Sequence, residues 1–241
     1  MEYQVNPGKK PAIAACGRIF LRLPLRTHFI KIGEALPPAL DQYARPHLQP
    51  GDVLCVCEKI VALSQKRVVY RKDIRPGFWA RLLSRCVRQT AAGVGAGEPH
   101  KMQLFIMECG LWRVLLAAFC SALTRPFGVK GVFYQVCGRD AAAIDGLADR
   151  GVSFAEYYDY GILAPDQPSQ VCRQMAEQLG VPCAIVDACD LGVEILGTSP
   201  DMPYGADQLA EILRDNPAGQ SDFQTPLVVV RPAEGHTADL N

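Results

Sequence analysis

The chain has 241 residues, of which 49% are apolar, and its 25 basic side chains balance its 25 acidic ones. This composition is typical of a globular protein with a substantial core, and the charge balance argues against nucleic acid or an acidic membrane surface as a partner. The first fifteen residues carry Glu2, Lys9 and Lys10 and lack the apolar stretch of a signal peptide. We therefore expect a cytoplasmic protein that binds neither nucleic acid nor a membrane.

The first half of the chain contains patterns of both strands and helices. Val53–Cys57 is a compact apolar run that follows a turn signal at 49–52, which predicts a buried strand. A short amphipathic helix is predicted over 78–88. Residues 131–137 show an alternating pattern and predict another strand.

The most apolar part of the chain lies at 109–123. We expect a second helix over 111–123, largely buried and stopped before Pro126. The apolar window is interrupted by Arg113 and is shorter than the roughly twenty residues that cross a bilayer. A buried helix is therefore favoured over a membrane span.

The clearest helical pattern lies at 169–179. Its apolar residues fall four apart on one face, Ser169 is placed to cap its N-terminus, and Gly180 is placed to end it. A strand over 184–186 follows and delivers Asp187 at its C-terminal end.

Ten cysteines are spread along the chain, and no C-x-x-C pair occurs. Several lie in apolar runs such as Val53–Cys57, where a thiol acts as a small hydrophobic group. This pattern argues against a structural zinc site and predicts reduced thiols. A thiol-based redox protein stays open as an alternative, which rests on the number of cysteines alone.

Three acidic residues end apolar runs of the kind that form strands, namely Asp140, Asp145 and Asp187. Carboxylates at strand ends can converge on a hard cation such as magnesium or manganese, which prefers oxygen ligands. Such a cation would then hold the phosphates of a nucleotide. The alternative is that these aspartates cap the next turn or helix.

A glycine-rich run at 92–97 would let backbone amides approach a phosphate, but it matches neither the Walker pattern nor the dinucleotide fingerprint. A flexible loop is the alternative. Of the four histidines, only His100 lies next to candidate binding residues, because it follows this run and Glu98. A solvated loop histidine explains the same pattern.

Several segments, in the same order along the chain, resemble the coenzyme F(420)-0:L-glutamate (gamma-glutamyl) ligase family. The most informative are 49–61, with the sequence QPGDVLCVCEKIV, 131–140, with GVFYQVCGRD, and the strand that ends in Asp187. Weaker matches lie at 23–27, 32–34 and 163–168. Together they cover roughly residues 18 to 200.

The resemblance implies an α+β fold of mixed sheets and helices in two entwined subdomains, and a homodimer. It places a ligase-like domain at 18–231, between an N-terminal extension at 1–17 and a flexible tail at 232–241. It also implies an enzyme that uses GTP and a divalent metal, Mg or Mn, to join glutamate to a small-molecule carboxylate. In such enzymes the carboxylate is activated as an acyl phosphate, which the amine of glutamate then attacks.

The resemblance also implies roles for particular residues. Asp140 and Asp187 match the metal-binding aspartates of the family, and the nearby Asp190 would add a third ligand. Lys59 matches the family lysine and would contact phosphate or carboxylate as a catalytic and nucleotide-binding residue. Arg139 would also bind the nucleotide.

This chain departs from the family pattern at three places. The family's Ser-Lys-Ala-Glu is Ala62-Leu63-Ser64-Gln65 here, and polar family residues are also replaced at 142–143 and 188–191. Because losing one charged contact costs on the order of 1.5–3 kcal/mol, these losses would abolish or redirect the parent activity. Three nearby acids could partly rebuild a metal site: Asp145, Asp190 and Glu194. The alternative function is therefore a catalytically inactive ligase fold that binds a small molecule.

Overall fold

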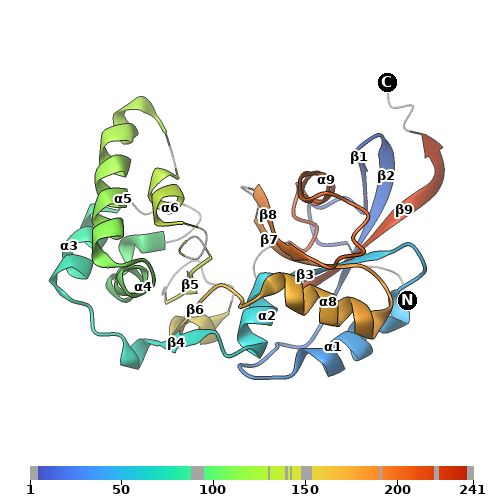
Figure 1. Cartoon of the computed structure of the whole chain (residues 1–241), viewed down its shortest axis with the longest axis horizontal. Coiled ribbons are helices and arrows are strands. Elements are labelled where there is room, and N and C mark those ends of the chain that lie inside the picture. The colour runs from blue at the N-terminus through green and yellow to red at the C-terminus, as the bar shows by residue number, and fades with distance from the viewer. Residues whose placement is uncertain are drawn as a thin grey trace. The chain divides into compact units, whose positions relative to one another are not determined.

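The computed structural model describes residues 5–87, 95–129, 131–138, 141, 143–147, 154–189, 192–219 and 223–237. The chain divides into two units (Figure 1): unit 1 comprises residues 1–66 and 165–241, and unit 2 comprises residues 67–164. Unit 2 is therefore an insertion in the sequence of unit 1. A mixed sheet, a second small sheet and helices confirm the predicted α+β class.

Unit 1 is built on a six-stranded sheet of order β1-β2-β9-β3-β7-β8. Only β3 and β7 are parallel neighbours, and every other neighbouring pair is antiparallel. The strands are β1 (Ala12–Ala15), β2 (Arg18–Leu25), β3 (Val53–Cys57), β7 (Cys183–Cys189), β8 (Gly192–Thr198) and β9 (Leu227–Thr237). The predicted buried strand at Val53–Cys57 is confirmed as β3.

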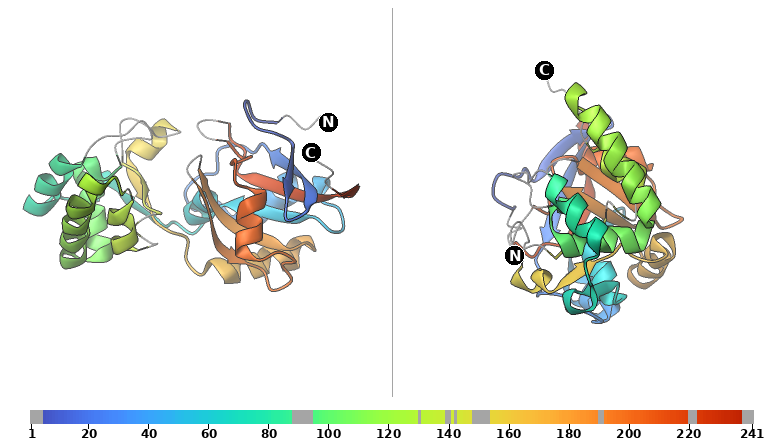
Figure 2. Two further views of the ribbon diagram at one scale, coloured as in Figure 1. Left: turned by 90° about the horizontal axis from the view of Figure 1, so that it is seen from above. Right: turned by 90° about the vertical axis from the view of Figure 1, so that its left-hand side faces the viewer.

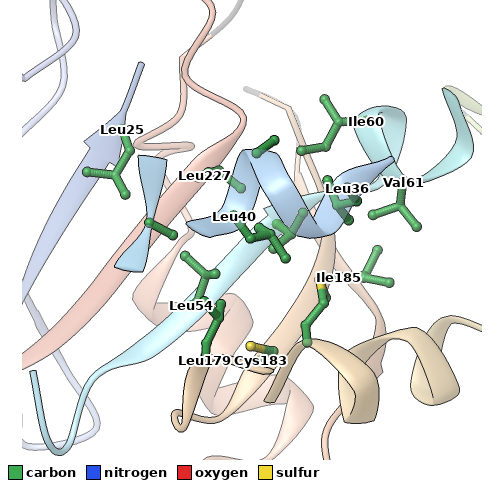
Figure 3. Packing of buried hydrophobic residues seen from close by; sticks show 14 of the residues in the cluster. Leu25, Leu36, Leu40, Leu54, Ile60, Val61, Leu179, Cys183, Ile185 and Leu227 are labelled. Carbon is green, nitrogen blue, oxygen red and sulfur yellow. The ribbon is translucent and has the colours of Figure 1, made fainter. Parts of the chain in front are cut away.

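Both faces of this sheet are covered. Figure 1 shows α9 (Ala206–Ile212) on one side and α1 (Leu36–Tyr43), α2 (Glu58–Ser64) and α8 (Pro168–Leu179) on the other. Alternate residues of β3 point into the two cores, so that Leu54 packs toward α1 and α8 (Figure 3) while Cys55 packs with α9. Burial on both faces explains why this strand is a continuous apolar run rather than an alternating one.

Two ion pairs with a fully buried member connect distant parts of unit 1. Arg22 pairs with Asp215 and also donates to the carbonyl of Lys10 at 2.6 Å. Asp52 accepts two hydrogen bonds of 2.7 Å from Arg231, which ties the start of β3 to β9. In each case the partner satisfies a charge that would otherwise be buried at high cost.

Unit 2 combines a three-stranded antiparallel sheet, of order β4-β6-β5, with a group of helices. Its strands are β4 (Val68–Tyr70), β5 (Asp145–Gly146) and β6 (Tyr160–Ile162). Its helices are α3 (Phe78–Cys86), α4 (Pro99–Cys109), α5 (Leu111–Thr124) and α6 (Val132–Cys137), and short 3₁₀ turns include η2 (Arg71–Asp73), η3 (Gly95–Gly97) and η4 (Arg125–Phe127). Their own apolar core includes Leu104, Phe105 and Leu147.

The strand predicted at 131–137 is wrong, because Val132–Cys137 forms the helix α6. Gly131 and Gly138, both with positive φ, flank this helix at its two ends. The aromatic rings that suggested a strand instead pack against the core of unit 2, with Phe105 and Phe133 centroids 5.7 Å apart in an edge-to-face contact. Tertiary packing here overrides the strand propensity of the side chains.

The helix predicted over 111–123 exists as α5, but the expectation that it is largely buried is wrong. Of its side chains only Val114 and Ala117 are buried, and Trp112 is 82% exposed. Figure 2 shows α5 (light green) with no other element of unit 2 in front of it. Within the described part of the chain, no single helix has the length and hydropathy to cross a membrane, and only the bent pair 99–109 and 111–127 meets that test jointly.

Three further expectations need correction in detail. Ser169 does not cap α8, because Pro168 occupies the first helical turn and Gln167 is the cap residue. Asp187 lies inside β7 rather than at its end, because β8 pairs with β7 as far as Cys189. Strand β9 extends past Pro232 to Thr237, where pairing with β2 continues beyond the predicted start of a loose tail.

Candidate functional site

The candidate site lies where the two parallel strands of unit 1 end their pairing. The register of β3 against β7 runs from Leu54 opposite Cys183 to Cys57 opposite Val186. Asp187 is therefore the first residue of β7 beyond this pairing, and Glu58 and Lys59 directly follow β3 as the start of α2. Ligands commonly bind outside the carboxyl ends of parallel strands, where loops and helix starts leave room for them.

The thiol of Cys57 reports how close these charged groups are. Burial raises the pKa of Cys57 to about 11, the positive charge of Lys59 acts in the opposite direction, and the negative charges of Glu58 and Asp187 raise it further. Lys59, Glu58 and Asp187 thus all influence one thiol. Of the residues predicted for the site, Lys59 and Asp187 both follow the last pair of the β3–β7 register, Lys59 at the start of α2 and Asp187 on β7.

Asp187 also has an acidic neighbour on β8. The register of β7 against β8 places Glu194 directly opposite Asp187, so both side chains lie on the same face of the sheet. Carboxylate oxygens are the donors that magnesium and manganese prefer, so this pair fits a hard cation. Within the described residues, no group of three or more His, Cys, Asp or Glu side chains is arranged to hold a metal ion. Magnesium is often held by one or two carboxylates together with substrate phosphates, which matches a pair of this kind.

The other predicted acids and the predicted arginine divide into two cases. Arg139, Asp140 and Asp190 lie outside the described residues. Asp145 lies in unit 2, where it accepts a 2.7 Å hydrogen bond from the backbone N–H of Gly146. This hydrogen bond is the one expected if Asp145 caps a turn, which is the alternative to a role as a metal ligand.

A family model described as F420-0:Gamma-glutamyl ligase matches residues 24–186, which is more than half of the chain. The chain belongs to this ligase family. A search of curated proteins found no match. The matched segment includes Lys59 and the whole of unit 2, and it ends at Val186, one residue before Asp187.

The ligase-family residues that this chain has lost in α2 and directly after it are replaced by side chains with structural contacts. Leu63 stands where the family has a lysine, and it is fully buried in a position that would strongly disfavour an ammonium group. Gln65 stands where the family has a glutamate, and its amide exchanges hydrogen bonds of 2.8 and 2.9 Å with the backbone of Asp166. The segment therefore stabilises unit 1 rather than offering polar groups to a ligand.

A second polar cluster lies in unit 2, and its central residue was not predicted. Arg71 donates to Glu98 Oε1 at 2.9 Å and to the carbonyl of Leu147 at 2.6 Å, and it stacks on the ring of Tyr158. His100 Nδ1 lies 2.7 Å from the same Glu98 oxygen. His100 is thus half-buried and hydrogen-bonded in the first turn of α4, not a solvated loop residue.

Next to this cluster lies a cavity of about 400 Å³, lined by Arg81, Ser84 and Arg85 of α3 together with Pro76, Gly97, Pro99 and His100. The glycine-rich run contributes Gly97 to its wall, while residues 92–94 of the run lie outside the described residues. The two arginines make this cavity basic, which suits an anionic group.

No disulfide joins the cysteines in the part of the chain that the structure describes. All ten are free thiols. Burial raises the pKa of Cys137 and of Cys172 to about 12, which disfavours the reactive thiolate. The thiol-based alternative therefore has no support from these buried positions.

Proposed function

We propose that this protein is a nucleotide- and metal-dependent ligase that forms an amide bond between an amino acid, glutamate in the first instance, and a small-molecule carboxylate. The observation that carries the proposal is the joint position of Lys59 and Asp187 beside Cys57, at the end of the β3–β7 pairing. Family membership supports the ligase class. GTP, Mg or Mn, and a homodimer are parts of the same proposal.

The chemistry has two steps. A carboxylate oxygen of the acceptor attacks the terminal phosphorus of GTP, and GDP leaves. The amine nitrogen of glutamate then attacks the acyl carbon, inorganic phosphate leaves, and the nitrogen loses a proton to solvent. The Lys59 ammonium would hold the terminal phosphate or the acceptor carboxylate and offset its charge.

The acidic residues would hold the divalent cation, which supplies positive charge against the phosphates. Asp187 and Glu194 are the described donors, and Asp140 and Asp190 are proposed as further ligands, with Arg139 on the nucleotide. Because Asp187 and Glu194 are directly opposite, their like charges favour binding of a cation between them.

A second candidate function is a ligase fold that binds a small molecule without catalysis. The buried Leu63 and the structural contacts of Gln65 favour it, since both positions carry charged residues in the family. This candidate differs from the first in one measurable respect: it does not require a nucleotide.

Thermal unfolding with GTP, ATP or GDP, each with and without Mg²⁺ or Mn²⁺, tests the proposal. A ligand at a hundred times its dissociation constant stabilises the folded state by about 2.7 kcal/mol. We expect a metal-dependent rise in melting temperature that Asp187→Asn and Lys59→Met abolish. Glu177→Gln, an exposed acid on α8, is the matched control and should keep the rise.

Two outcomes separate the candidates. Stabilisation by GTP with metal that depends on Asp187 supports the ligase and justifies assays for glutamate-dependent phosphate release. Absence of any shift with all three nucleotides would contradict the ligase proposal and favour the non-catalytic binding protein.

A further inference from the structure

The exposed apolar side chains of this protein are concentrated in unit 2. All twelve large hydrophobic residues that are exposed within the described part of the chain lie between residues 70 and 158. Ten of them come from α3, the end of α4, α5, and the segment that follows α5: Phe78, Trp79, Leu82, Met107, Trp112, Leu116, Phe119, Leu123, Phe127 and Val129. The described residues of unit 1 contribute none, and both tryptophans of the chain belong to this set.

Helix α5 carries the largest part of this surface. Its exposed apolar residues follow one another at intervals of four, three and four positions, so they form a single stripe along the helix: Trp112, Leu116, Phe119 and Leu123. Phe127 in η4 extends the stripe. With exposed fractions of 82%, 60% and 83%, the rings of Trp112, Phe119 and Phe127 alone present on the order of 400–500 Å². The largest apolar patch on a monomer is often functional, and these three rings alone reach the usual size of such a patch.

The charge of the chain is also unevenly divided. Residues 67–164 contain thirteen Lys and Arg against eight Asp and Glu, whereas unit 1 contains twelve against seventeen. Helices α3 and α5 carry arginines, at positions 81, 85 and 113, and no acidic residue. The net charge of the whole chain is therefore zero, although unit 2 is basic and unit 1 is acidic.

A cation-lined cavity adjoins the apolar surface on α3. Arg81 and Arg85 line the cavity of about 400 Å³, and the exposed Phe78, Trp79 and Leu82 lie on the same short helix. Arginine binds phosphate oxygens through two parallel N–H groups. A molecule that joins a phosphate to an apolar group would therefore match both the arginines and the exposed apolar side chains of α3.

These features together discriminate between possible partners. A second copy offers either another unit 2, which is apolar but carries the same positive charge, or a unit 1, which is acidic but presents no large exposed hydrophobic residue among those described. A bilayer that contains anionic lipids offers negative charge and an apolar interior at once. Tryptophan and arginine are also well suited to the boundary between headgroups and acyl chains.

We propose, in contrast to the expectation drawn from the net charge of the whole chain, that unit 2 docks peripherally on an anionic lipid bilayer through the stripe of α5 and the apolar end of α3. The fourteen residues of α5 form a helix about 21 Å long, which would lie in the plane of the interface rather than across it. Arg81, Arg85 and Arg125 bind lipid phosphates. The docking surface excludes the Lys59–Asp187 site of unit 1, so it would place the proposed ligase chemistry at a membrane surface without taking part in it.

Intrinsic fluorescence of the full-length protein provides a direct test, because both tryptophans lie on the proposed surface. In Trp79→Phe, Trp112 is the single reporter. We expect its emission to shift to the blue on addition of phosphatidylcholine vesicles that contain phosphatidylglycerol, and to stay unchanged with phosphatidylcholine alone. High salt should weaken the shift because it screens the arginines.

Variants separate the apolar and the charged contributions in a vesicle co-sedimentation assay. Phe119→Ser with Leu123→Ser should lower the partition coefficient more than tenfold, since two apolar anchors are lost. Arg85→Gln with Arg125→Gln should lower it roughly fivefold for each cation removed. Arg173→Gln, an exposed arginine on α8 of unit 1, is the matched control and should bind like the unchanged protein. Circular dichroism confirms that each variant is folded.

Binding to anionic vesicles that the unit 2 variants lose and Arg173→Gln keeps supports the proposal. It is overturned if the folded protein binds no vesicle, or if it binds equally well with and without anionic lipid. A concentration-dependent dimer that buries Trp112 without lipid would also overturn it in favour of a second copy. Nucleotide-dependent thermal shifts are measured separately on the same variants, so failure of docking and failure of the ligase proposal are distinguishable.

Discussion

The two units treat their apolar residues in opposite ways. In unit 1 the central strands are covered on both faces, and no large hydrophobic side chain is exposed among the described residues. In unit 2 one helix buries two residues and exposes a stripe of four. Apolar side chains therefore build the core of unit 1, whereas those of the α5 stripe are not covered by any described residue of unit 2.

This contrast agrees with the distribution of charge. Unit 1 is acidic and contains the parallel strands whose pairing ends next to Lys59 and Asp187. Unit 2 is basic and contains the exposed helices. A division between a unit for chemistry and a unit for attachment follows from the two proposals, and the predictions below address each half of it.

The sharpest test of the contrast compares one apolar side chain from each unit. Leu54 in β3 is fully buried, so Leu54→Ala should lower the free energy of unfolding by about 3–5 kcal/mol. Phe119 in α5 is 60% exposed, so Phe119→Ala should change it by roughly 0.5 kcal/mol or less. Urea denaturation followed by circular dichroism measures both. A large loss in Phe119→Ala would show that something covers the α5 stripe in solution.

The buried ion pair at the start of β3 should have the next largest effect. Asp52→Asn removes a buried carboxylate that accepts two hydrogen bonds from Arg231, and we expect a loss of about 2–3 kcal/mol. The matched control is Asp41→Asn, because Asp41 of α1 pairs with Arg45 at the exposed surface, where ion pairs contribute little to stability. Equal losses in the two variants would show that burial of the pair is not what matters.

The acid dependence of stability should reveal the second ion pair of unit 1. Burial raises the pKa of Asp215, but the hydrogen bonds and the charge of Arg22 outweigh this effect, so the pKa lies below its ordinary value. A depressed carboxyl pKa stabilises the folded state above the pKa of the unfolded chain, near 4, and this stabilisation is lost as the pH falls through the folded value. Asp215→Asn should therefore flatten the acid side of the stability curve. An unchanged slope between pH 5 and pH 2, measured by denaturant titration at each pH, would contradict this assignment.

How far the sequence predicts the fold depends on whether local pattern or tertiary packing decides each element. Strand β3 is predictable because burial on both faces leaves a continuous apolar run after a turn. Helix α6 is not predictable in this way. Its β-branched and aromatic residues favour a strand locally, but packing against Phe105 stabilises the helix. For α5 the pattern predicts the helix but cannot state which sides other elements cover.

The candidate site shows the same limit. Lys59 and Asp187 follow from short segments that resemble the family, and the parallel register of β3 and β7 brings them together. The structural role of Gln65, which binds the backbone of Asp166, depends on a contact between positions 101 residues apart. Local sequence patterns likewise do not predict the Arg71–Glu98 pair, because the two residues are 27 positions apart and only the tertiary structure brings them into contact.

The smallest expected effect is a change in the reactivity of Cys57, which tests the electrostatics of the site without any substrate. Because the pKa of Cys57 is raised to about 11, iodoacetamide at pH 8 should alkylate it on the order of 100-fold more slowly than the exposed Cys86. Asp187→Asn removes a charge that raises this pKa and should speed alkylation, while Lys59→Met removes one that lowers it and should slow alkylation. Each change should be roughly tenfold or less.

The opposite signs of these two variants make the measurement informative. A general loosening of the fold would speed alkylation of Cys57 in both variants, whereas the charges of the site act in opposite directions on the same thiol. Rates at single cysteines, obtained by mass spectrometry of digested protein, separate the two cases, and Cys86 in unit 2 provides an internal reference. Addition of Mg²⁺ or Mn²⁺ should then speed alkylation in the unchanged protein but not in Asp187→Asn, because a cation held by Asp187 would favour the thiolate. If metal has no effect while the two variants still differ in sign, Lys59 and Asp187 would form a charged pair beside Cys57 that does not hold a cation.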